Sequence, residues 1–75
     1  MNDTFSALAH ELDRESHDWL AENHPSIADS IAQAVQRGAT PESIRAFIIR
    51  RVGVNRLDFA RRAEAAARYL TEQGG

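Results

Sequence analysis

Three histidines stand at positions 10, 17 and 24, an even spacing of seven residues that raises the question of a metal site. Seven residues are close to two helical turns, so neighbouring histidines on one helix lie about 10 Å apart along its axis. A zinc ion holds its nitrogen ligands at about 2 Å, so no two of these imidazoles can share an ion. We therefore expect no metal and no other cofactor, and we expect Asp13 and His17 to form an ordinary i,i+4 pair on an exposed helix face.

Side chains for nucleophilic or acid–base catalysis are scarce. The chain has neither cysteine nor lysine, and it contains no glycine-rich phosphate loop and no Gly-x-Ser-x-Gly motif. Glu11 and Glu15 form a carboxylate pair, but the helical pattern places both on a polar outer face. A catalytic carboxylate pair needs a pocket that separates the two pKa values. We therefore expect no catalytic residues and no enzyme activity.

These side chains must be held by helices, because the apolar residues recur at helical spacing and no strand pattern is present. The pattern predicts one domain, residues 1–75, with helices over residues 4–22, 26–37, 41–52 and 56–72. Ser26 and Asp29 stand at capping-box spacing, Gly38 ends the second helix, and Thr40 and Pro41 cap and begin the third. The predicted fold class is an all-α, compact single-domain bundle of four short helices.

The core of such a domain is small, because a chain of this length buries only about 60% of the surface that it exposes when unfolded. The third helix carries a wide apolar arc, which predicts that it is the central and most buried helix. The fourth helix has an alanine-rich face, which packs either on the first helix or on another chain. The expected core residues are Phe5, Leu8, Leu12, Trp19, Ile31, Val35, Ile44, Phe47, Ile48, Val52, Phe59 and Leu70.

Charge is divided unevenly along the chain. Residues 1–36 hold seven acids and one arginine, a net charge of −6, whereas residues 37–75 hold eight arginines and four acids, a net charge of +4. The two halves can pair within the fold, which we favour slightly, or between protomers, or the basic half can face a polyanion. The chain contains no apolar run of about 20 residues and no signal-peptide pattern at its start, so we expect a cytoplasmic protein without a membrane partner.

Residues 38–48 read GATPESIRAFI and are compatible with the turn and second helix of a DNA-binding helix-turn-helix. Ala34, Ile44 and Phe47 fall four residues before, six after and nine after Gly38, where that motif needs one small and two apolar residues. Over residues 31–51 the chain resembles helix-turn-helix domains of the response-regulator type. The resemblance implies a small DNA-binding regulator that uses residues 33–51. The candidate nucleic-acid contacts are Thr40, Ser43, Arg45 and Arg50.

The leading functional hypothesis is a non-catalytic protein-interaction or adaptor module, because a small core, a polarised surface and an alanine face favour a protein partner or a second copy. DNA binding is the alternative, and an acidic inhibitor that mimics nucleic-acid charge is a third. In a homodimer, acids of the first helix would meet arginines of another copy, and alanines of the fourth helix would supply apolar contact. The candidate interface residues are Asp13, Glu15, Asp18, Arg61, Arg62, Ala63, Ala66 and Ala67.

Overall fold

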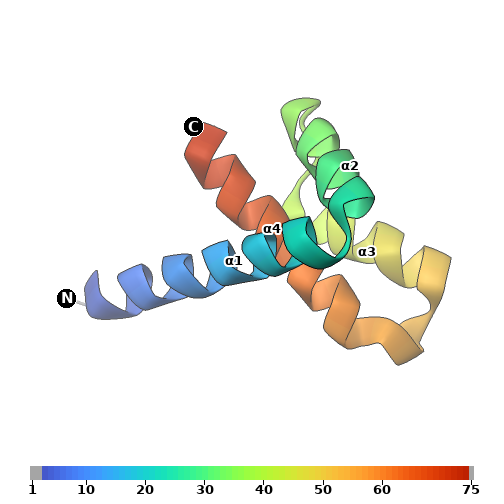
Figure 1. Cartoon of the computed structure of the whole chain (residues 1–75), viewed down its shortest axis with the longest axis horizontal. Helices are drawn as coiled ribbons and strands as arrows, with labels where there is room; N and C mark the ends of the chain where they lie inside the picture. The colour runs from blue at the N-terminus through green and yellow to red at the C-terminus, as the bar shows by residue number, and fades with distance from the viewer. Residues whose placement is uncertain (1–2, 75) are drawn as a thin grey trace.

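The computed structural model describes residues 3–74, and it consists of four α-helices and one short 3-10 turn (Figure 1). The elements are α1 (Asp3–Asn23), α2 (Pro25–Gln36), α3 (Pro41–Val52), η1 (Val54–Arg56) and α4 (Leu57–Gly74). No strand occurs among these residues. The structure therefore confirms the all-α bundle of four helices, and the helix bounds lie within two residues of those expected.

The turn between α2 and α3 is built from local hydrogen bonds and one glycine. Gly38 has a φ of +100°, a conformation that glycine adopts without the steric cost of a Cβ. The Ser43 N–H then donates to the Thr40 Oγ1 at 3.1 Å, and the Thr40 N–H donates to the Ser43 Oγ at 3.0 Å. These reciprocal bonds form a capping box that starts α3. The box expected at Ser26 does not form, because α2 begins at Pro25 and places Ser26 inside its first turn.

α4 is the central helix, because it packs against α1, α2 and α3 (Figure 1). Its alanines Ala60, Ala63, Ala66 and Ala67 are buried almost completely. Small side chains allow three helices to approach one axis closely, and an alanine face therefore suits a central position. The prediction that the third helix is the most buried is wrong: α3 exposes Phe47 and Val52.

α1 packs on α4 through a face that differs from the one predicted. Asp13, His17 and Leu20 recur at helical spacing on the side turned towards the bundle, and Leu20 is fully buried. The predicted core residues Phe5, Leu8 and Leu12 are 69%, 53% and 52% exposed. The physical reason is the crossing geometry. The first turns of α1 extend beyond the other helices (Figure 1), and Leu12 lies about 100° around α1 from the buried Asp13, away from the contact with α4.

The remaining core lies where the four helices meet. Of the predicted core residues, Ile31, Ile44, Ile48 and Phe59 are buried, whereas Trp19, Val35 and Leu70 are partly buried and pack against this cluster. In the part of the chain that the structure describes, no helix is long and apolar enough to cross a membrane.

Candidate functional site

A polar seam joins α1 to α4. The Arg68 Nε donates to the Asp13 Oδ2 at 2.8 Å and the Arg68 Nη2 donates to the Asp13 Oδ1 at 3.1 Å, so the guanidinium binds the carboxylate with two bonds. The Asp13 side chain is only 8% exposed and the Arg68 side chain 47% exposed. The hydrogen bond to Asp13 raises the pKa of Arg68 above its ordinary value. The expected Asp13–His17 pair is thus replaced by a bond between the acidic and basic halves of the chain.

Two of the three histidines lie along the same seam. His10 and His17 flank Tyr69, with ring centroids 5.5 Å and 5.2 Å from the tyrosine ring, and the His10 Nδ1 lies 2.8 Å from the Glu72 Oε1. His24 packs instead between Trp19 and Phe59. The described residues contain no group of three or more potential metal ligands. The histidines therefore serve as packing and hydrogen-bonding groups.

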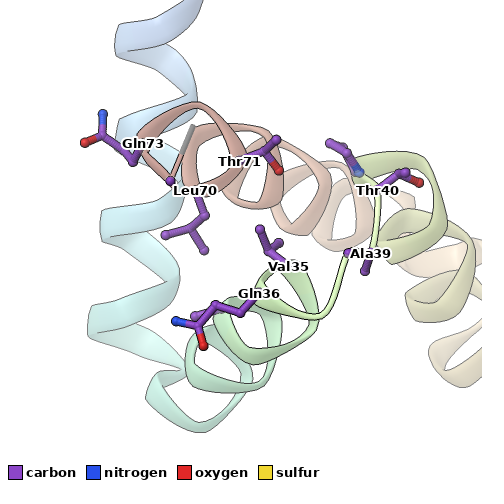
Figure 2. Close-up of a pocket in the computed structure, with 11 residues that line it drawn as sticks. Val35, Gln36, Ala39, Thr40, Leu70, Thr71 and Gln73 are labelled. Atoms are coloured by element: carbon purple, nitrogen blue, oxygen red, sulfur yellow. The ribbon is translucent and has the colours of Figure 1, made fainter.

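A cleft with a volume of about 730 Å³ lies between α2, the α2–α3 turn and the end of α4 (Figure 2). Figure 2 shows Val35 of α2 and Leu70 of α4 on facing sides of it. None of its lining side chains is ionisable, so it offers no general acid, general base or charged ligand for a metal. The lining residues are Ala32, Val35, Gln36, Gly38, Ala39, Thr40, Pro41, Leu70, Thr71, Gln73 and Gly74.

An apolar stripe runs along the projecting half of α1. We define the α1 stripe as Phe5, Leu8 and Leu12, which recur at i, i+3 and i+7 and are each more than half exposed. Helical residues at this spacing share one face and act together as anchors when a helix binds in a groove. The stripe continues towards Trp19, whose ring is partly buried and covered by the Arg62 guanidinium at 4.3 Å from the ring centroid.

A second apolar surface lies between α2 and α3, which both pack on α4 rather than closely against each other. The resulting α2–α3 groove has a volume of about 210 Å³. Small-molecule pockets are usually larger, about 300 to 1,000 Å³, so this groove fits protein side chains better than a free ligand. The α2–α3 groove is formed by Ile27, Ser30, Ile31, Ala34, Ile44, Phe47 and Ile48.

The candidate nucleic-acid contacts are distributed along α3. The Thr40 and Ser43 hydroxyls are both engaged in the capping box, and the Arg45 Nε lies 3.6 Å from the Glu64 Oε1. Arg50 is exposed and forms no salt bridge with any residue of the range 3–74. Ile44 is buried, as a helix-turn-helix requires, whereas Phe47 is more than half exposed. Of the four candidates, the structure leaves Arg50 as the one without an intramolecular partner.

The candidate interface residues fall into two groups. Ala63, Ala66 and Ala67 are buried within the chain itself. They are therefore not available to a second chain, and the prediction that they form an interface is corrected. The physical reason is that α1 and α3 already occupy the alanine face. Among the charged candidates, Asp13 is bonded to Arg68 and Arg62 covers Trp19, as described above. The Asp18 Oδ1 lies 3.3 Å from the His17 Nδ1. The exposed charged candidates without an ion-pair partner in the described chain are Glu15, Arg61 and Arg62.

Sequence reasoning missed both the groove and the Asp13–Arg68 pair. The sequence shows an apolar stripe on the second helix, formed by Ile27, Ile31 and Ala34. Whether a groove forms beside this stripe depends on how α3 packs on α4. Asp13 and Arg68 are 55 residues apart, beyond the reach of any local spacing rule. Comparisons of the chain with protein-family models, with curated proteins and with solved structures each give no match.

Proposed function

We propose that this chain is a small, non-catalytic protein-interaction module that binds through the α1 stripe. The observation that carries the proposal is the exposure of Phe5, Leu8 and Leu12 on a half-helix that projects from the bundle. A contiguous exposed set of large apolar side chains commonly marks a protein-binding surface. Fully burying a side chain of this size contributes about 1.5 to 3 kcal/mol before the entropic cost of association, so burial of the three anchors favours binding.

The cleft between α2 and the end of α4 is lined by no ionisable side chain, which supports a binding role rather than a catalytic one. DNA binding through α3 remains the alternative proposal, and Arg50 is the candidate contact best placed for it. An acid-mimic inhibitor would act through the exposed carboxylates of α1, such as Glu15. DNA binding would use α3, whereas the interaction module uses the α1 stripe, so these two can be separated by substitutions in one helix or the other.

Site-specific photo-crosslinking tests the proposed function. A benzoylphenylalanine is placed at position 8 of the full chain, and a matched control carries it at Ser6, which lies about 160° around the helix from Leu8. After irradiation in the cells that naturally produce the protein, mass spectrometry identifies the crosslinked product. We expect an identified protein adduct at position 8 and none at position 6.

Duplex-DNA anisotropy provides the opposing measurement. If position 8 gives no protein adduct, while the chain binds DNA with an affinity that falls steeply with salt and weakens in Arg50→Ala, the DNA-binding alternative replaces this proposal.

A further inference from the structure

We propose that the α2–α3 groove binds the α1 stripe of a second copy of this chain. The inference rests on the proposed function, because it names the partner that the stripe contacts. It assigns a role to the α2–α3 groove. It also predicts that the interface joins two different surfaces, the stripe of one copy and the groove of the other, rather than two copies of the same surface.

The two surfaces match in length and spacing. Phe5 and Leu12 stand seven positions apart on α1, and the ends of the groove wall, Ile27 and Ala34, stand seven positions apart on α2, so each is about 10 Å long. A helix that docks in a groove uses anchors at i, i+3 or i+4 and i+7, and the α1 stripe has this pattern. Both surfaces are apolar; the stripe is exposed, and Ser30 and Phe47 are the exposed residues of the groove.

The charges beside the groove are basic. Phe47, at the groove edge, is followed three and four residues later by Arg50 and Arg51, which share its side of α3. The Arg51 guanidinium lies 5.7 Å from the centroid of the Phe47 ring. Arg37, the C-cap residue of α2, stands seven residues after Ser30 and so lies beyond the same side of that helix. The acid nearest in sequence, Asp29, is two residues from both Ile27 and Ile31 and therefore about 160° away around α2.

The charges beside the stripe are acidic. Glu11 and Glu15 stand three and seven residues after Leu8, and Glu15 forms no salt bridge with any described residue. Arg14, between them in sequence, is paired with Glu11. The acidic side chains beside the stripe and the arginines beside the groove have opposite charge. This complementarity favours the encounter of two copies and fixes their relative orientation.

The same charges argue against the two simpler arrangements. Two α1 stripes packed on each other would bring the Glu11 and Glu15 side chains of both copies together, and like charges in contact are unfavourable. The stripe cannot enter the groove of its own chain, because the N-terminal end of α1 and α3 lie at opposite ends of the long axis of the molecule (Figure 1), which measures 38 Å. A stripe that occupies the groove must therefore come from another copy.

Each protomer carries both surfaces, so the contact either closes as a two-fold dimer or continues head to tail. Sedimentation velocity of the purified full-length chain tests the contact. A stripe variant carries Leu8→Glu with Leu12→Glu, a groove variant carries Ser30→Glu with Arg51→Glu, and Ser6→Glu is the matched surface control. All substituted positions are exposed, and circular dichroism of each variant checks that the helices remain.

We expect the unaltered chain and the Ser6→Glu control to associate as concentration rises. Each double variant alone should lower the association constant by about 10- to 100-fold, because it removes apolar burial or introduces like charge. An equimolar mixture of the two variants should recover association that stops at a heterodimer, because one intact stripe can then meet one intact groove.

Two results would overturn the inference. A monomer at all concentrations for the unaltered chain would exclude self-recognition, and the protein-interaction function would still stand if crosslinking at position 8 identified a different protein. Self-association of the groove variant, with no complex in the mixture, would show that the stripes pack on each other instead.

Discussion

The Asp13–Arg68 bridge should respond unequally to the loss of its two partners. Arg68→Ala removes both hydrogen bonds from a carboxylate that is 8% exposed, whereas Asp13→Ala leaves a guanidinium that is 47% exposed and can be solvated in place. Burying an ionised group without a partner is far more costly than exposing one to water. We therefore expect Arg68→Ala to be the more destabilising change.

The magnitudes follow from this difference in exposure. Removing one partner of a buried ion pair costs about 3 to 5 kcal/mol. Because the Asp13–Arg68 bridge lies at the edge of the bundle, we expect Arg68→Ala to cost about 3 kcal/mol, the lower value. A hydrogen bond to a charged group contributes about 1.5 to 3 kcal/mol, and solvent exposure of Arg68 reduces the loss in Asp13→Ala to about 1 to 1.5 kcal/mol. The losses in the two variants thus differ by about 1.5 to 2 kcal/mol. For a domain of this size each kcal/mol shifts the melting temperature by about 4 to 8 °C, so the two melting temperatures should differ by roughly 6 to 16 °C.

The pKa of Arg68 determines how the stability contributed by the bridge depends on pH. The pKa of Arg68 is raised by its bond to Asp13, so the arginine stays charged, and its contribution would be lost only as the pH rises beyond the range of the assay. The difference in stability between the unaltered chain and Arg68→Ala should therefore stay the same between about pH 7 and pH 9.

Urea and thermal unfolding, followed by circular dichroism and Trp19 fluorescence, measure these effects. Arg61→Ala is the matched control, because Arg61 is an exposed arginine of α4 without an ion pair among residues 3–74, and it should leave stability unchanged. The reasoning is refuted if Asp13→Ala is the more destabilising change, or if the deficit of Arg68→Ala changes between about pH 7 and pH 9.

Three further substitutions test the packing. Leu20→Ala should destabilise the chain by about 2 to 5 kcal/mol because Leu20 is fully buried. Leu8→Ala should have little effect on unfolding of the monomer, because Leu8 is more than half exposed. Equal losses of stability in urea unfolding would contradict the orientation of α1. Ala66→Leu should destabilise the fold by about 1 to 3 kcal/mol through overpacking, and a variant of unchanged melting temperature would place that alanine outside the core. Thr40→Ala should cost about 1 kcal/mol because it removes the acceptor that caps α3, and thermal unfolding that matched the unaltered chain would show the cap to be dispensable.

The local sequence was sufficient to predict the helices and the turn between α2 and α3. Helical periodicity is a property of neighbouring residues, and so are the effects of Gly38, Thr40 and Pro41 at the helix ends. These features depend on contacts within a few residues, which the sequence displays directly. The helix bounds were accordingly predicted to within two residues.

The exposed surfaces could not be predicted in the same way. Phe5, Leu8 and Leu12 have the pattern of a buried face, and only the crossing of α1 over α4 leaves them in solvent. Periodicity identifies which residues share a face, but it does not say whether a second helix reaches that face. The candidate interaction surface was therefore predicted as core.

By itself, the sequence determined that the chain forms four helices, where they begin and end, and that its two halves carry opposite charge. Only the tertiary structure decided that α4 is central, that Asp13 meets Arg68, and that an apolar stripe and a groove stay open. The physical reason is range: hydrogen bonds and caps within a helix act between near neighbours, whereas burial depends on how whole helices cross, and residues far apart in the chain set that angle together.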